Sequence, residues 1–114
     1  MTEFNESRFA ESLIAFRHEL HRFPELSHQE FETTARLRAR LGSHHIRILD
    51  LPLKTGLVAE IGDPQGPLVV LRSDIDALPI EEQSGVEYRS QIRVSCMPAG
   101  MTSIAPRRWV QPFC

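Results

Sequence analysis

The spacing of hydrophobic residues changes near residue 42, and this change constrains the fold of the 114-residue chain more than any other feature. Before that point, apolar residues recur every three or four positions, as they do on one face of a helix. In the first such stretch they are Phe9, Leu13, Phe16 and Leu20. The spacing predicts a surface helix over 7–20 with one buried stripe, ending before Pro24.

A capping motif predicts the start of a second helix. Ser27 and Glu30 have the spacing of a capping box, in which a serine hydroxyl and a glutamate carboxylate each bind an unpaired amide at a helix start. We therefore expect the helix to begin near His28. It should end at Gly42, because glycine readily adopts the left-handed conformation that closes helices.

Extended segments are expected after the second helix. Apolar residues over 46–53 and the stretch TGLVAEIG at 55–62 predict short strands. After turn-forming residues at 63–66, the sequence PLVVLR at 67–72 is continuously apolar, as expected of an inner strand covered on both faces. Helices followed by strands predict a layered α/β unit.

Two aspartates, Asp74 and Asp76, directly follow the last apolar stretch. In an extended backbone, residues two apart point to the same side, so the pair would form a local negative pocket. One interpretation is that they cap a helix or turn before Pro79. The other is that they lie at the carboxyl end of an inner strand, where open α/β sheets place ligands, and there bind or orient a metal or a catalytic histidine.

Composition excludes some partners. The chain has 13 basic and 15 acidic residues, and the net charge of −2 gives no general attraction to nucleic acid or to an anionic membrane. There is no apolar core of a secretory signal, and the run Leu68–Leu71 is too short to span a bilayer, so a cytoplasmic location is expected. Cys96 and Cys114 lack a CxxC spacing and are interpreted as incidental thiols.

Four of the five histidines are interpreted as solvated surface or turn residues, because none has a partner at the spacing of metal ligands. They are His18, His28, His44 and His45.

Three separated stretches resemble the amino-terminal part of the M20 family of metal-dependent peptidases. They are FRHELHRFPELSHQEFETT, TGLVAEIG and VVLRSDIDALPIEEQSGVEYRSQ, and the resemblance as a whole covers roughly residues 8–92. The similarity is greatest to the amidohydrolase branch, which includes hippurate, N-acyl-amino-acid and auxin-conjugate hydrolases. The resemblance implies that residues 1–92 are an incomplete, amino-terminal part of a three-layer α/β/α catalytic domain.

The resemblance also implies a chemistry. In that family two divalent ions, Mn or Zn, activate a water and polarise the amide carbonyl of an N-acyl amino acid or peptide, while a distant glutamate acts as general base. Asp76 matches the carboxylate that orients the metal site. Asp74 stands where other branches have a histidine ligand, so its own role stays open. His21 and Glu25 match a recurrent signature that we interpret as structural. Full-length relatives could form homo-oligomers.

The last 22 residues, 93–114, depart abruptly from the family pattern. The family continues with a HACGHD motif that binds the metals, whereas this chain reads RVSCMPAGMTSIAPRRWVQPFC. When the bases are read in the frame shifted by one nucleotide, the codon that joins Met97 to Pro98 must encode Ala, and the codon that joins Met101 to Thr102 must encode Asp. The other codons of this frame can encode PGVMHACGHDFNSATALGAALL. We therefore predict that 93–114 is an out-of-frame tail. The alternative is a genuine basic and aromatic tail that binds an anion or a partner through Arg107, Arg108 and Trp109.

The sequence leaves two interpretations of what the 114-residue chain does. Without the motif ligands, a chain descended from an amidohydrolase should bind metals weakly and be inactive alone. The alternative is a small, non-catalytic α/β interaction module.

Overall fold

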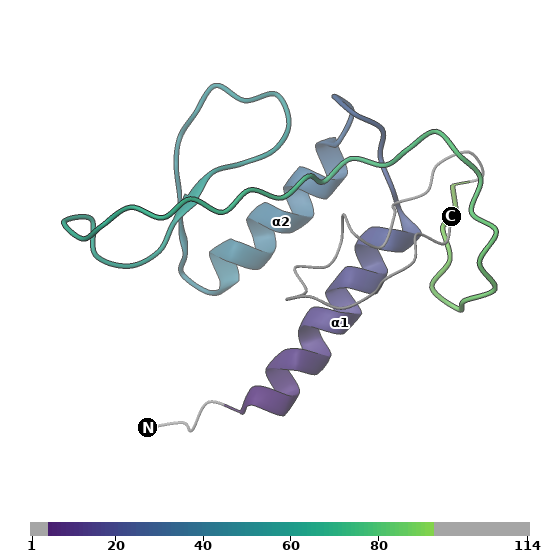
Figure 1. Cartoon of the computed structure of the whole chain (residues 1–114), viewed down its shortest axis with the longest axis horizontal. Coiled ribbons are helices and arrows are strands. Elements are labelled where there is room, and N and C mark those ends of the chain that lie inside the picture. The colour runs from purple at the N-terminus through teal and green to yellow at the C-terminus, as the bar shows by residue number, and fades with distance from the viewer. Residues whose placement is uncertain (1–4, 93–114) are drawn as a thin grey trace.

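The computed structural model describes residues 5–92 and contains two helices and a small sheet (Figure 1). In chain order these elements are α1 (Glu6–Arg22), α2 (Phe31–Ser43), β1 (Arg47–Ile48) and β2 (Ala59–Glu60). Among the residues described, neither helix has the length and apolar character needed to cross a membrane. Both cysteines and the proposed out-of-frame tail lie outside the described residues.

Helix α1 forms where the apolar spacing predicts it. Its first turn is capped by Asn5, whose side-chain oxygen accepts a hydrogen bond from the Arg8 amide at 3.1 Å. The predicted stripe is only partly buried, because Phe9 is 36% exposed and Leu13 is 44% exposed. Towards the carboxyl end of the helix the burial increases, and His21 in the last turn is buried.

Helix α2 begins three residues later than predicted, at Phe31, and the predicted capping box is wrong. His28 has a φ of 66°, which is outside the helical region, and Glu30 is the N-cap residue but makes no side-chain cap. The cap comes instead from Glu25 in the preceding loop. Its carboxylate accepts hydrogen bonds from the amides of Glu32 at 3.2 Å and Thr33 at 2.5 Å. Glu25 in the preceding loop therefore caps α2, in place of the predicted local pair of Ser27 and Glu30.

The two strands pair in an antiparallel register, with Arg47 opposite Glu60 and Ile48 opposite Ala59. The hydrogen bond from the Leu49 amide to the Val58 carbonyl, at 2.8 Å, extends this pairing. Strand formation is thus confirmed within 46–53 and 55–62, but each strand is only two residues long. The sheet packs against α2.

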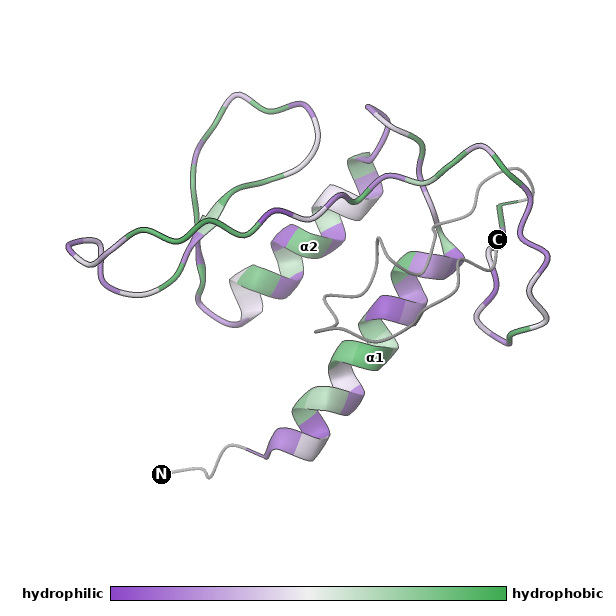
Figure 2. Ribbon diagram, viewed as in Figure 1, coloured by the Kyte–Doolittle hydropathy of each residue, from purple (hydrophilic) through white to green (hydrophobic). Residues whose placement is uncertain are grey.

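The segment 67–72 is not a strand in the described part of the chain, and the prediction of a covered inner strand is wrong there. Its four central residues, Leu68 to Leu71, are 86%, 82%, 77% and 86% exposed. Figure 2 shows this hydrophobic stretch as an extended chain that belongs to no helix or strand. An inner strand needs neighbours on both edges and cover on both faces, and residues 5–92 supply neither.

The interior is small and largely polar. Ala77, at 3% exposure, and Pro24 are the buried apolar residues of the described part, and His21, Glu30, Thr33 and Glu82 are buried with them. Ala77 lies where the loop between the two helices meets the segment around residue 77. Leu26 and Ala77 form a parallel bridge there, and the Ala77 amide donates to the Glu25 carbonyl at 2.7 Å. The expected α/β class is confirmed, although residues 5–92 do not build three layers.

Candidate functional site

An open groove of about 640 Å³ contains both predicted site aspartates. It is bounded by the loop before α2, the loop after β1 and the chain that follows the exposed apolar segment. The lining residues are Ser27, His28, Glu30, Thr55, Gly56, Arg72, Ser73, Asp74, Ile75 and Asp76. Asp74 and Asp76 both line the groove, together with the intervening Ile75. The structure also adds polar groups that the sequence did not indicate.

Asp74 lines the groove and is exposed. Its Oδ1 atom is 2.7 Å from a guanidinium nitrogen of Arg72, and the side chains are 48% and 84% exposed, respectively. Such exposed pairs contribute little to stability because water screens them. Arg72 nevertheless offsets the negative charge that Asp74 would otherwise add beside Asp76.

Asp76 is more firmly placed than Asp74. It is half-buried, and its neighbour Ala77 is fixed by the hydrogen bond to the Glu25 carbonyl and by the bridge to Leu26. The backbone at Asp76 is thus held by the same loop that caps α2. Of the two predicted residues, Asp76 is the more buried.

Thr34 joins two residues that line the groove, Glu30 and Gly56. Its hydroxyl donates to the Glu30 carbonyl at 2.5 Å and accepts from the Gly56 amide at 2.8 Å. Gly56 has a φ of 78°, a conformation that glycine adopts at low cost. Sequence reasoning missed both residues. The Thr-Gly pair at 55–56 carried a turn signal, but it was interpreted as the start of a strand.

The described residues do not form a metal site. Glu30 is 6% exposed and its Oε2 atom is buried without a hydrogen-bond partner, so a cation there would be electrostatically favoured. However, within residues 5–92 no group of three or more His, Cys, Asp or Glu side chains is arranged to hold an ion. The donor set of this part of the chain therefore does not fit a dinuclear centre.

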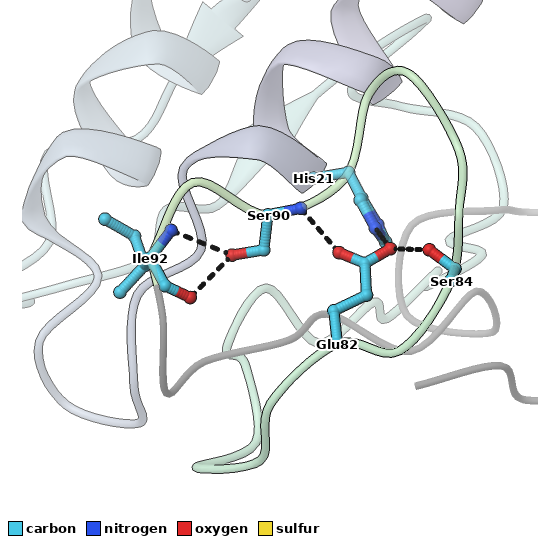
Figure 3. A network of polar contacts seen from close by, with 5 residues as sticks. All are labelled: His21, Glu82, Ser84, Ser90 and Ile92. Carbon is cyan, nitrogen blue, oxygen red and sulfur yellow. Dashed lines mark hydrogen bonds and ion pairs between the residues drawn. The ribbon is translucent and has the colours of Figure 1, made fainter.

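A second polar cluster lies at the end of α1 (Figure 3). The Nε2 atom of His21 is 2.9 Å from Oε1 of Glu82, and both side chains are almost completely buried. The Ser84 hydroxyl donates to Oε1 of Glu82, and the Ser90 amide donates to Oε2 at 2.5 Å. Ser90 in turn exchanges hydrogen bonds with the backbone of Ile92. We call His21, Glu82, Ser84 and Ser90 the buried clasp.

The surroundings of Glu82 favour its charged form. Burial by itself raises the pKa of this carboxyl, but the hydrogen bonds from Ser84, Ser90 and His21 outweigh it and hold the pKa below its ordinary value. The clasp therefore contains a carboxylate satisfied by several donors. The sequence analysis interpreted His21 as structural but did not indicate its partner, because His21 and Glu82 are 61 residues apart.

The prediction that His18 is solvated is wrong. Its ring stacks on Tyr88 with centroids 3.7 Å apart and planes inclined by 7°, and the side chain is half-buried. Desolvation lowers its pKa, and the nearby charges of Arg17 and Arg22 lower it further. The other three histidines of that group are exposed, as predicted, although His28 lines the groove and His44 contacts the ring edge of Phe9.

Comparison with known proteins connects this arrangement to a family of enzymes. The chain is 49% identical over 88 residues to N-acetyl-L-cysteine deacetylase of Bacillus subtilis, which covers 76% of this chain and 21% of the relative. It is 48% identical over 89 residues to N-acetylcysteine deacetylase of the same organism, covering 76% and 23%. No family model matches the chain.

A solved structure has the same fold over the matched part. It is the crystal structure of a Bacillus subtilis protein described as a dinuclear metal-binding peptidase of the M20 family. The TM-score is 0.80 at 43% sequence identity, and the match covers 85% of this chain and 28% of that one.

The fold and the sequence matches together define a hydrolase-type α/β unit. The chain belongs to the M20 family of metallopeptidases, and its relatives are hydrolases. It spans about a fifth of the length of the curated relatives that it matches.

Proposed function

We propose that the chain is the amino-terminal portion of a metal-dependent amidohydrolase that cleaves the amide bond of N-acyl amino acids. The main support is the match at 43% identity to a dinuclear metal-binding M20 peptidase with a TM-score of 0.80. The names of two relatives, both deacetylases of N-acetylcysteine, favour a short acyl group on an amino acid. Hippurate, an aromatic N-acyl amino acid, is a second substrate to be tested.

Within this proposal Asp76 is the carboxylate that orients the site, and Asp74 lies beside it in the groove. Bound metals would supply an activated water and polarise the substrate carbonyl. Residues 5–92 lack a set of metal ligands, so we expect those ligands to come from sequence beyond the matched part. The 114-residue chain is accordingly predicted to be inactive alone.

The proposal includes the tail. Residues 93–114 are proposed to be translated out of frame after the loss of one nucleotide, because the neighbouring frame permits HACGHD at the position where the family has it. Sequencing the gene across the Ile92 and Arg93 codons tests this directly. An intact frame whose bases cannot encode HACGHD would refute it.

Activity is tested with two purified proteins. The first is the 114-residue chain, and the second is the product of the same gene with one nucleotide restored before the Arg93 codon. Release of free amino acid from N-acetylcysteine and from hippurate is measured with added Mn²⁺ or Zn²⁺. We expect turnover only from the restored product. Turnover by the 114-residue chain would contradict its predicted inactivity.

The Asp76→Asn variant of the restored product separates the roles of the two aspartates. It should lose most of the activity, because asparagine keeps the shape of the side chain and removes its charge. Asp74→Asn is expected to have a smaller effect, since Asp74 is exposed and already paired with Arg72. Equal losses would contradict this assignment.

A non-catalytic module is the less well supported alternative. A module that functions by itself would be expected to cover its own apolar residues, but Leu68 to Leu71 are at least 77% exposed in the described part of the chain.

A further inference from the structure

The HRFPEL stretch at 21–26 is a motif to which the proposed function gives no task. In the structure it runs from the last turn of α1 towards α2, and it binds two later segments of the chain, one at each of its ends. Its backbone has little freedom at the centre, because Pro24 is buried and its ring fixes φ. We call residues 21–26 the bracket.

The first end of the bracket holds the segment around residue 90. The Nε2 atom of His21 is 2.9 Å from the Glu82 carboxylate, which also accepts a hydrogen bond from the Ser90 amide at 2.5 Å (Figure 3). The carbonyl of Arg22 accepts from the Gln91 amide at 2.8 Å. These bonds fix both the place and the direction of the chain at residues 90 and 91.

The second end of the bracket holds Asp76. The Glu25 carbonyl accepts from the Ala77 amide at 2.7 Å, and Leu26 forms a parallel bridge with Ala77. Because Asp76 directly precedes Ala77, the same contacts hold its backbone. The Glu25 carboxylate also caps α2, so the bracket is fastened to that helix as well. One short segment therefore sets the positions of Asp76 and of residues 90–91 together.

The contacts of the first end are polar, and this favours a role in positioning. A buried polar contact adds less stability than apolar packing of the same volume, but its hydrogen bonds require fixed distances and directions. Position matters at a reacting site, since a displacement of about 1 Å can lower a rate by about a hundredfold. The contacts of His21 and Glu82 therefore suit a task in which the exact place of a segment counts.

We propose that the bracket is a positioning element of the candidate site, which sets where the chain after residue 91 lies relative to Asp76. This inference rests on the proposed function. In the neighbouring reading frame the HACGHD motif begins a few codons beyond Ile92, so it would reach the site from the segment that His21 and Glu82 hold. Asp76 belongs to the other end of the bracket. His21 and Glu82 touch no substrate in this assignment and act only through the segment they hold.

Hydrogen exchange of the 114-residue chain tests the bracket without metal or substrate. His21→Ala should speed exchange of the Gln91 amide by about tenfold or more, because residues 90 and 91 lose their anchor. Arg40→Ala is the matched control, since it removes a bond of 2.7 Å to Ser12 between the two helices and leaves the bracket intact. Equal exchange of the Gln91 amide in the two variants would overturn the inference.

The restored single-chain product tests whether the bracket acts on the site. Co²⁺ is the probe, because its visible spectrum reports the arrangement of its ligands. The variants are compared at a temperature where circular dichroism shows all of them folded. His21→Ala should weaken Co²⁺ binding by about tenfold or more and change the spectrum, whereas Arg40→Ala should bind Co²⁺ with the unaltered spectrum.

A conservative variant completes the series. His21→Gln should recover most of the Co²⁺ binding, since its amide can donate to the Glu82 carboxylate from nearly the same place as the Nε2 atom of the imidazole. If His21→Ala is folded and binds Co²⁺ like the unaltered product, the contact serves stability alone and the inference fails.

Hydrolysis of N-acetylcysteine separates this inference from the proposed function. If the restored product binds Co²⁺, loses that binding in His21→Ala and hydrolyses no N-acyl amino acid, the inference stands and the function fails. If the restored product is active and His21→Ala has the same kcat, the function stands and the inference fails. A restored product that binds no Co²⁺ overturns both.

Discussion

The imidazole of His21, at the end of α1, lies 2.9 Å from the carboxylate of Glu82, 61 residues further along the chain. Both side chains are buried, and the Ser90 amide holds the second carboxylate oxygen. Close by, the amide of Gln91 donates to the carbonyl of Arg22 at 2.8 Å. The clasp therefore fastens residues 82–92 to the first helix.

Removal of His21 tests how much this clasp stabilises the fold. His21→Ala should lower the free energy of unfolding by about 2 kcal/mol, because the buried Glu82 carboxylate loses one of its three hydrogen-bond partners. His44→Ala, at an exposed position, should change it by less than about 0.5 kcal/mol. Urea unfolding of the two variants checks this. Equal effects would show that the clasp contributes little.

The stability of the chain should fall in acid because of Glu82. Its pKa in the folded state is below the ordinary value of 4.5, so its contribution is present at neutral pH and is lost as the pH falls through that value and then through the folded pKa. Thermal melting from pH 7 to about pH 3 is compared with that of Glu82→Gln. The difference in melting temperature between the two proteins should become smaller in acid. A difference that stays the same at every pH would contradict the prediction.

Glu25 is predicted to stabilise the start of α2. Glu25→Ala should cost about 1 kcal/mol or more, because the amides of Glu32 and Thr33 lose their acceptor. The stability of Glu25→Gln should lie between those of the unaltered chain and Glu25→Ala. The glutamine side chain has one carbonyl oxygen, so it can accept from only one of the two amides at its present geometry. Glu32→Gln, a change of the same kind at an exposed site, should be nearly neutral. Unfolding free energy and helical circular dichroism measure the series.

Gly56 should be intolerant of alanine for a backbone reason. No atom lies within 4 Å of an added Cβ, but the φ of +78° is unfavourable for alanine, so Gly56→Ala should cost about 1 kcal/mol. Gly85→Ala is the matched control, because its site is equally open and its φ is not in the left-handed region. If both variants unfold at the same urea concentration, backbone strain at Gly56 is negligible.

Much of the helical structure could be predicted from the sequence. The spacing of Phe9, Leu13 and Phe16 indicated α1, because helix formation depends on contacts three and four residues apart. The start of α2 could not be predicted in the same way. Ser27 and Glu30 have the spacing of a local cap, yet the amides are bound by Glu25 seven and eight residues away.

The candidate site was only half predictable. The sequence pointed to Asp74 and Asp76, which both line the groove, but the position of Gly56 in the same groove depends on its contact with Thr34, 22 residues away. The role of either aspartate in catalysis stays a prediction.

By itself, the sequence determined the helices, the aspartate pair and the likeness to M20 enzymes, since these depend on near neighbours or on short motifs. Only the tertiary structure decided that 68–71 is uncovered and that Glu82 meets His21. A strand and a buried hydrogen bond between side chains need partners distant in sequence, and residues 5–92 supply the partner for the hydrogen bond but not for the strand.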